Sequence, residues 1–295
     1  MTEISSSLVV VSFYDRRPLA PLLDLLASLG KHTAGGKYSI AIVVNSTGDW
    51  RLPDAISDEV QHVLYRNNTG MNIGAWDAGW RAFPDYDRYL FVQDECLATH
   101  AGWLAGLLDP LDDPTVGMVG ESFNHNWAKP WPALRVAAGT AVMPEHEIDG
   151  TPANRVDVYL DFMRREGIEP GEMGGHLRSL IWALRRPVLE AIDGFPQGAN
   201  YGECIAAEIA VSKAIEAKGL VVRQVDPRPF KWFRHIEWNQ DQPGGPYTHA
   251  PVLRRQHEAR QAEIERLRAS LESPTWAGWR AMTAVLLRKT FAGWC

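Results

Sequence analysis

The chain has 295 residues and a mass of 33.0 kDa, enough for one large domain or two smaller ones around a substantial core. Apolar residues make up 45% and charged residues 22%, close to the average of globular proteins, which excludes a disordered or fibrous chain. The net charge of −6 lacks the positive balance of nucleic-acid-binding domains, so no nucleic-acid partner is expected.

The sequence also bears on the compartment. It contains no run of about 18 apolar residues, so no membrane-spanning helix is predicted. No positively charged segment precedes the first apolar run, which argues against a secretory signal. The three cysteines, Cys96, Cys204 and Cys295, lack metal-site spacing and suit a reducing environment. These features predict a cytoplasmic location.

The first 120 residues alternate between short apolar runs typical of buried strands and segments with helical spacing. Helices are predicted at 18–29 and 72–82, and strands at 8–13, 38–44, 61–65, 88–92 and 116–120. Strands that alternate with helices predict right-handed βαβ units, and therefore an α/β fold with a mostly parallel central sheet flanked by helices.

The pattern changes after residue 120, where residues 124–175 form an insert with one amphipathic segment at 156–165. Regular periodicity returns at 180–184, followed by helices at 187–192 and 204–218, a strand at 220–222 and a charged helix at 254–271. We therefore predict one domain over 1–245, with a ligand-binding half 1–120 and a second half 121–245, followed by a helical extension over 246–295.

Polar side chains follow the predicted strands where each strand ends. Open α/β sheets bind ligands just past the carboxyl ends of their strands. Two adjacent carboxylates, Asp94 and Glu95, come directly after the strand 88–92 and need a cation or hydrogen bonds to offset their charge. Mg²⁺ and Mn²⁺ take such oxygen ligands, so the pair predicts a metal site, with a solvated acidic turn as an equal alternative.

A second candidate is Glu208, which falls inside the apolar arc of the helix 204–218. Partial burial would raise its pKa and suit it to general-base chemistry. Glu203, just before the helix, is a rival that fits a capping role better. His235 lies among aromatic residues, where it is either a core residue or a third metal ligand, and His176 and Arg178 are candidates for holding a phosphate.

Taken together, the order of these features resembles the GT-A fold glycosyltransferases, in particular the large family-2 group that uses nucleotide-sugar donors. Residues 10–16 resemble that family's opening strand and its Tyr-Asn-Arg-like turn, and residues 68–79 resemble its helix start near the donor. Residues 43–49 resemble its Val-Asp-Asp-Gly-Ser-Thr-Asp motif, in which Asn45 replaces the acid that contacts the nucleobase.

The later motifs continue the resemblance. Residues 93–95, Gln-Asp-Glu, take the position of the metal-binding Asp-x-Asp motif, with both of its acids replaced. Residues 193–195 are similar to the Gly-Gly-Phe turn before the acceptor helix. Glu208 matches the family's catalytic base, and His235 matches its late histidine at the metal or diphosphate.

The resemblance implies a GT-A fold and a hexosyl- or deoxyhexosyltransferase of polysaccharide biosynthesis. Such an enzyme would move a sugar from a UDP-, GDP- or dTDP-sugar to a hydroxyl of a glycan or lipid-linked acceptor, with inversion. Glu208 would be the base, and Asp94, Glu95 and His235 would hold Mn²⁺ or Mg²⁺. The implied donor-binding residues are Tyr14, Asp15, Asn45, Asn72, Asp77, Gln93, Asp94 and Arg178, and the implied acceptor-binding residues are Trp127, Trp131, His176 and Glu203.

The altered acidic motif leaves open a non-catalytic module that binds a sugar nucleotide or a glycan. A nucleotidyltransferase ranks third, because the turn after the first strand has no glycine. The tail, with Trp276, Trp279 and Trp294 beside basic residues, predicts either peripheral contact with the inner face of a membrane or docking on its own domain or on a second copy in a homodimer.

The 12 tryptophans fit this division. Aromatic faces pack well against the apolar faces of sugar rings, which predicts sugar contacts for Trp76 and Trp80 and an acceptor lid at Trp127 and Trp131. Trp103 and Trp182 are predicted to be core residues.

Overall fold

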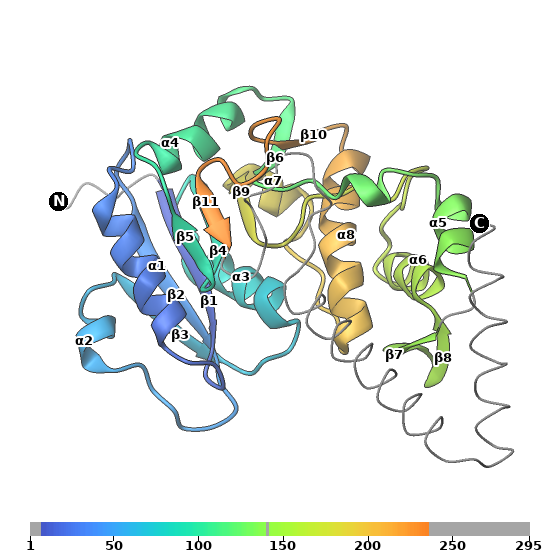
Figure 1. Ribbon diagram of the computed structural model, residues 1–295, viewed down its shortest axis with the longest axis horizontal. Coiled ribbons are helices and arrows are strands. Elements are labelled where there is room, and N and C mark those ends of the chain that lie inside the picture. The colour runs from blue at the N-terminus through green and yellow to red at the C-terminus, as the bar shows by residue number, and fades with distance from the viewer. Residues whose placement is uncertain (1–6, 140–141, 236–295) are drawn as a thin grey trace, which may run out of the picture. The chain divides into compact units, whose positions relative to one another are not determined.

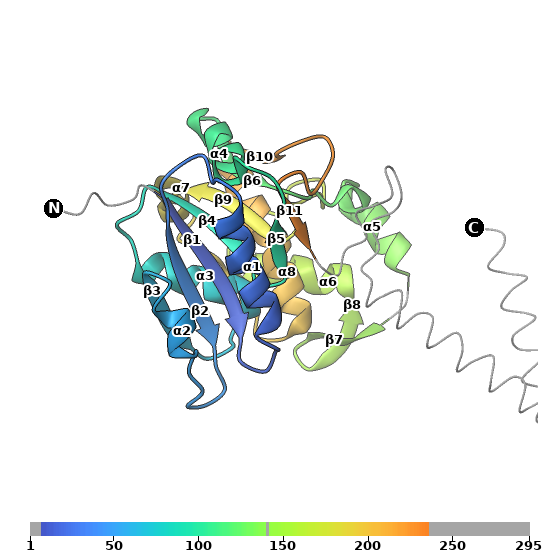
Figure 2. The same ribbon diagram turned by 60° about the vertical axis from the view of Figure 1, so that its left-hand side comes forward.

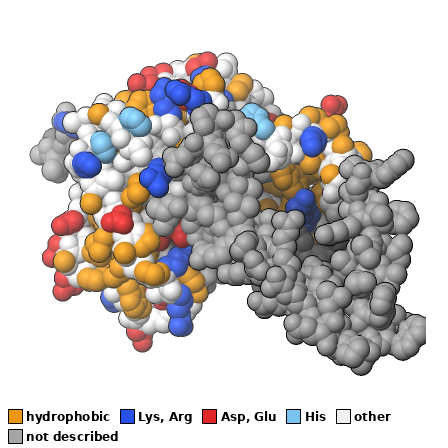
Figure 3. Space-filling model, viewed as in Figure 1, with side chains coloured by type: hydrophobic (Ala, Val, Ile, Leu, Met, Phe, Trp, Pro, Cys, Tyr) orange, Lys and Arg blue, Asp and Glu red, His pale blue; other side chains and the backbone are white. Residues whose placement is uncertain are grey.

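The computed structural model describes residues 7–139 and 142–235, which belong to one compact unit, Met1–Ile236. The predicted helix at 254–271 and the tryptophans of the tail lie outside the described residues, so the expectations of membrane contact and of a homodimer through the tail stay predictions. Among the helices that the structure describes, none is both long and apolar enough to cross a membrane. The face seen in Figure 3 mixes acidic, basic and apolar side chains.

A seven-stranded sheet forms the centre of the fold, in the order β10-β6-β9-β4-β1-β2-β3 (Figure 1). Only β9 runs antiparallel to its neighbours, β4 and β6, so the sheet is mostly parallel. Its strands are β1 (Ser7–Tyr14), β2 (Ser39–Asn45), β3 (His62–Arg66), β4 (Arg88–Gln93), β6 (Val116–Gly120), β9 (Ile181–Arg185) and β10 (Val221–Gln224). Each of the strands predicted from the sequence is present.

Helices cover both faces of this sheet (Figures 1 and 2). One face packs against α1 (Ala20–Lys31) and α4 (Trp103–Leu108), and the other packs against α3 (Met71–Ala82), α7 (Arg186–Ala191) and α8 (Tyr201–Ala217). The two sides of β1 therefore lie in different core clusters, with Val10 on the α3 side and Val11 on the α1 side. A strand buried on both faces has no polar side to show, which explains its unbroken apolar run.

The insert 124–175 folds against α8. It supplies the 3₁₀ turn η2 (His125–Trp127), α5 (Trp131–Ala138), the hairpin of β7 (Val142–Ile148) and β8 (Thr151–Asn154), and α6 (Arg155–Arg165), which contacts α8. Smaller elements are α2 (Asp54–Ser57), the 3₁₀ turn η1 (Asp109–Asp112), and the antiparallel pair β5 (Cys96–Ala98) and β11 (Phe233–His235).

The tryptophans on α3 are core residues, contrary to the sugar-contacting role predicted for them. Trp76 and Trp80 are only 0% and 7% exposed. The indole N–H of Trp76 donates to the carbonyl of Val92 at 3.3 Å, and its ring lies 5.2 Å from that of Trp182. Gly79 lets α3 approach the sheet closely, because a Cβ there would lie 2.6 Å from Val10 Cγ1 of β1. Trp103 and Trp182 are buried as predicted.

Candidate active site

A cavity of about 400 Å³ lies at the carboxyl ends of β1, β2 and β4, the sheet edge at which a ligand site was predicted. Five of the predicted donor-binding residues line it: Tyr14, Asn45, Asn72, Gln93 and Asp94. Another cavity, of about 500 Å³, is lined by Ser7 and Arg88, at the opposite ends of β1 and β4. We place the site in the first cavity because the candidate residues converge there.

Asn45 lines this cavity, and its amide makes two hydrogen bonds within the protein. It accepts a hydrogen bond from Arg66 Nη1 at 2.7 Å and donates to the carbonyl of Met71 at 2.9 Å. These contacts tie the end of β2 to β3 and to the start of α3. A contact between Asn45 and a nucleobase stays a prediction.

Asp15 organises the neighbouring loop. Its Oδ2 accepts hydrogen bonds from Ser46 Oγ and from the backbone N–H of Thr47, each at 2.9 Å. Its Oδ1 is buried without a hydrogen-bond partner among the described residues. The donor-binding role of Asp15 stays a prediction, because this residue does not line the cavity.

Asp77 occupies a structural position and does not line the cavity, so the donor-binding role expected for it stays a prediction. It is buried and accepts hydrogen bonds from the Trp80 indole at 3.0 Å and from the backbone N–H of Phe195 at 2.9 Å. Arg81 pairs with it at 3.0 Å. Asp77 therefore anchors α3 to the turn at 193–195, and its oxygens are used within the protein.

The two adjacent carboxylates differ in their surroundings. Asp94 is 5% exposed, and its Oδ2 has no hydrogen-bond partner within the described part of the chain. Burial, reinforced by the charge of Glu95, raises the pKa of Asp94 to about 7. Glu95 is better compensated, because its Oε1 pairs with Arg17 at 2.5 Å and its Oε2 lies 3.7 Å from His235 Nε2.

The expected metal ligands therefore lie close together without forming a closed site. Within residues 7–139 and 142–235, no group of three or more His, Cys, Asp or Glu side chains is arranged to hold a metal ion. Of the three expected ligands, Glu95 and His235 lie 3.7 Å apart. Asp94 Oδ2 is buried and has no hydrogen-bond partner among the described residues. A cation would have to draw its other ligands from a bound phosphate or from water.

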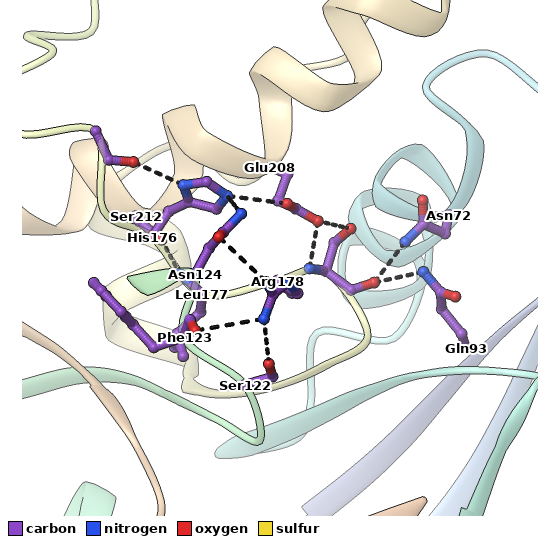
Figure 4. Close-up of polar contacts among 12 residues, drawn as sticks. Asn72, Gln93, Ser122, Phe123, Asn124, His176, Leu177, Arg178, Glu208 and Ser212 are labelled. Carbon is purple, nitrogen blue, oxygen red and sulfur yellow. Dashed lines mark hydrogen bonds and ion pairs between the residues drawn. The ribbon is translucent and has the colours of Figure 1, made fainter. Parts of the chain in front are cut away.

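Glu208 projects from α8 into a network of hydrogen bonds (Figure 4). The backbone N–H and the hydroxyl of Ser179 both donate to Glu208 Oε2 at 2.6 Å. The carbonyl of Ser179 in turn accepts from Asn72 Nδ2 at 2.9 Å and from Gln93 Nε2 at 2.6 Å. Ser179 thus connects Glu208 to two side chains that line the cavity.

The pKa of Glu208 is lowered, whereas the sequence predicted that burial would raise it. Burial does act in the raising direction, but the contacts with His176 and with the hydroxyl and N–H of Ser179 outweigh it. The expectation was wrong because the donors come from residues 176 and 179, which the sequence does not place next to Glu208. Glu208 is therefore ionised at neutral pH.

His176 faces Glu208 and does not face open solvent. Its Nε2 lies 3.1 Å from Glu208 Oε1, and its Nδ1 lies 2.8 Å from the carbonyl of Gly174, which can only accept a hydrogen bond. Nearby, Arg178 donates to Ser122 Oγ at 2.7 Å and to Asn124 Oδ1 at 3.2 Å (Figure 4). His176 therefore lies against the carboxylate of Glu208, and the acceptor or phosphate contact predicted for it stays a prediction.

Two predicted acceptor residues have structural roles. Trp131 is buried, and its indole N–H bonds to the carbonyls of Pro170 and Gly171 at 3.2 and 3.1 Å. Glu203 accepts from the backbone N–H of Ala199 at 2.8 Å and pairs with Arg165, which fits its capping alternative. Trp127 is half-buried, with its ring centroid 6.1 Å from that of His176, so it remains a candidate for acceptor contact.

Ser179, Arg17 and Tyr201 have site positions that the sequence analysis did not assign. A single serine in a loop carries no signal of its own, and Ser179 matters only because its turn meets α8. The position of Tyr201 could have been found from the sequence. It precedes Glu208 by seven residues, or two helical turns, so both side chains lie on the same side of α8. Tyr201 is exposed and lines the cavity, as does Arg17.

No family model matches the sequence, and no curated protein sequence matches it. Solved structures do resemble it. The mannosyltransferase PcManGT from Pyrobaculum calidifontis, in complex with GDP-Man and Mn²⁺, shares 14% identity at a TM-score of 0.48, over 76% of this chain and 55% of that one. This chain thus spans about half of that mannosyltransferase.

Two further solved structures resemble this chain to a similar degree. A CMP:2-keto-3-deoxy-manno-octonic acid synthetase complexed with CTP shares 15% identity at a TM-score of 0.42, over 88% of this chain and 99% of that one. The catalytic domain of Drosophila beta1,4galactosyltransferase 7, in complex with xylobiose, shares 14% identity at a TM-score of 0.40, over 84% and 79%. The mostly parallel seven-stranded sheet flanked by helices on both faces is the α/β architecture that the sequence predicted.

Proposed function

We propose that this chain is a glycosyltransferase that moves a sugar from a nucleoside-diphosphate donor to a hydroxyl group of an acceptor. One observation carries the proposal. Hydrogen bonds through Ser179 link the cavity-lining side chains Asn72 and Gln93 to the ionised carboxylate of Glu208. A donor in the cavity and a base beside it are what a single displacement at a sugar carbon requires.

The donor is a UDP-, GDP- or dTDP-sugar held in the cavity. Its diphosphate lies near Asp94 and Glu95, where Arg17 already provides a positive charge. The unpartnered oxygen of Asp94 and the Glu95–His235 pair suit a divalent cation that also binds phosphate oxygens. Bound Mn²⁺ or Mg²⁺ would offset the negative charge that develops on the leaving diphosphate.

Glu208 is the general base. A carboxylate has about four lone-pair positions, and the N–H and hydroxyl of Ser179 fill two of them on Oε2. His176 Nε2 lies 3.1 Å from Oε1 and fills a third only in the imidazolium form, because the Nδ1 proton is directed to the carbonyl of Gly174. The remaining position, on Oε1, accepts the proton of the acceptor hydroxyl. The freed oxygen then forms a bond to the anomeric carbon while the bond from that carbon to the diphosphate breaks. A single displacement of this kind inverts the sugar carbon, as in glycoside hydrolysis with one base.

The acceptor is a glycan or a lipid-linked saccharide, approached from the side of the insert 124–175. Trp127 is half-buried there, beside His176, and an aromatic face suits the apolar face of a sugar ring. The transferred sugar is a hexose or deoxyhexose, and the reaction serves polysaccharide biosynthesis in the cytoplasm.

A non-catalytic module that binds a sugar nucleotide is the second candidate. The observation in its favour is the environment of Glu208, whose two oxygens both receive hydrogen bonds from the protein and whose pKa is lowered. A carboxylate with a lowered pKa is a weaker base, which suits a binding protein as well as an enzyme.

A thermal-unfolding panel of UDP-, GDP- and dTDP-sugars, with and without Mn²⁺, tests the proposal. A ligand that binds only the folded chain raises the unfolding midpoint, and the nucleotide that raises it most identifies the donor. Incubation of that donor with glycan acceptors should then yield a product with inverted configuration by NMR. A raised midpoint without transfer or donor hydrolysis would favour the binding module, and no shift with any nucleotide would contradict both candidates.

A further inference from the structure

Glu121 is a fully buried carboxylate outside the cavity. It follows β6 directly, is 0% exposed, and accepts three consecutive backbone N–H groups. Its Oε2 accepts from Lys231 at 2.8 Å, and its Oε1 accepts from Trp232 at 2.7 Å and from Phe233 at 3.0 Å. A buried carboxylate is costly unless it is fully hydrogen-bonded, so this arrangement ties residues 231–233 to the end of β6.

The bound segment is constrained from two other directions. The backbone of Phe230 takes a left-handed conformation (φ 59°), which residues other than glycine rarely adopt. The carbonyl of Trp232 accepts from the N–H and the hydroxyl of Thr99 at 2.9 and 3.0 Å. The indole of Trp232 fills the space beside Gly106 on α4, where an added Cβ would overlap the ring.

This segment leads directly into β11, which pairs with β5 over only three residues. Phe233 lies opposite Ala98, and His235 lies opposite Cys96. Because β5 begins immediately after Glu95, this register brings His235 Nε2 to 3.7 Å from Glu95 Oε2. A slip of one residue would turn His235 to the opposite face of the pair and remove it from Glu95.

We propose that Glu121 is a positioning residue. By accepting hydrogen bonds from the N–H groups of residues 231–233, it fixes the register of β11 on β5 and holds His235 beside Glu95. The inference rests on the proposed function only in assigning Glu95 and His235 to the donor diphosphate or its cation. Glutamine cannot replace Glu121, because its amide NH₂ would face a backbone N–H where an oxygen now accepts.

Amide hydrogen exchange of the full chain tests the contact directly. In Glu121→Gln the amides of residues 231–233 should exchange about tenfold faster, while those of α8 keep their protection. Arg234→Ala is the matched control, because it changes an exposed side chain of β11 and leaves the three N–H groups intact. Unchanged exchange at 231–233 in Glu121→Gln would overturn the proposal. If Glu121→Gln does not fold, Glu121→Asp replaces it. The shorter aspartate should raise the exchange rate of the amides of residues 231–233 several-fold, and an unchanged rate would overturn the proposal.

Calorimetric titration of Mn²⁺ together with UDP or GDP tests the link to His235. Glu121→Gln and His235→Ala should each weaken binding, and the double variant should bind no more weakly than His235→Ala alone, because Glu121 acts through His235. Additive losses would overturn that link. If the unmodified chain binds neither Mn²⁺ nor a nucleoside diphosphate, the proposed function fails, and the exchange experiment still decides whether Glu121 fixes β11.

Discussion

At the scale of single residues, the surroundings of Glu208 decide what its carboxylate can do. Its neighbours His176 and Ser179 stabilise the negative charge more than burial opposes it. Folding stability linked to Glu208 is therefore present above the ordinary pKa of a glutamate and is lost as the pH falls through the lowered value. Between them, these contacts keep the candidate base ionised and pointed toward Ser179.

Replacement of this base should separate catalysis from binding. We expect Glu208→Gln to lower the rate of sugar transfer by about 10²- to 10⁴-fold, the usual contribution of a general base, with the Kd of the donor nearly unchanged. Glu216→Gln is the control, since Glu216 lies on the same helix, is 41% exposed and pairs with Lys213. Near-normal transfer by Glu208→Gln would show that another group removes the proton.

The hydroxyl of Ser179 should influence the pH dependence of the reaction. Ser179→Ala removes one hydrogen bond that lowers the pKa of Glu208, so that pKa should rise. A base must be ionised to act, so the acid limb of the kcat/KM profile should move to higher pH in the variant. The profile is to be measured from pH 4 to pH 8, and an acid limb at the same pH in both proteins would refute this assignment.

At the scale of elements, the fit of β11 against α4 depends on one glycine. An added Cβ at Gly106 would overlap the Trp232 indole, which leads into β11, whereas an added Cβ at Gly30 of α1 meets nothing within 4 Å. The two helices thus offer a matched comparison of the same substitution in a filled and an open environment.

We expect Gly106→Ala to destabilise the chain by about 1–3 kcal/mol, because overpacking displaces neighbouring side chains. Gly30→Ala should stabilise it by about 0.5 kcal/mol through its helix propensity. Urea unfolding gives both free energies. Equal effects of the two substitutions would show that Trp232 does not fill the space beside α4.

At the scale of the whole molecule, two buried acids set how stability depends on pH. Burial raises the pKa of Asp94 and of Glu121 to about 7, from ordinary values of 3.8 and 4.5. Between those values and pH 7 the folded chain binds more protons than the unfolded chain. Their contribution to stability is therefore fully present below pH 3.8, the lower of the two ordinary values, and is lost as the pH rises through about 7.

The thermal midpoint should therefore fall between pH 5 and pH 8, and the slope should be smaller in Asp94→Asn, whose side chain does not ionise. Asp58→Asn, at an exposed position, should keep the original slope. Midpoints measured at four pH values in this range suffice. An unchanged slope in Asp94→Asn would mean that Asp94 is stabilised as an anion, as a bound cation would cause.

The sequence determined most of the fold by itself. Periodicity predicted six of the seven strands and the helices α1, α3, α7 and α8, and it marked the apolar segments that form β9 and α6, because burial on one or both faces leaves a regular apolar pattern. It also predicted that polar residues converge at one sheet edge, where the structure has a cavity, since the direction of parallel strands fixes where their carboxyl ends meet.

Only the tertiary structure decided how the polar residues are used. Asp77, Trp131 and Glu203 looked like site residues, yet their polar atoms are taken by partners far away in the chain or at a helix end. Ser179 and Glu121 looked unremarkable, yet each binds a segment 29 or more residues away. A carboxylate's pKa and role depend on which donors surround it within a few ångströms, and that proximity arises only when distant parts of the chain pack together.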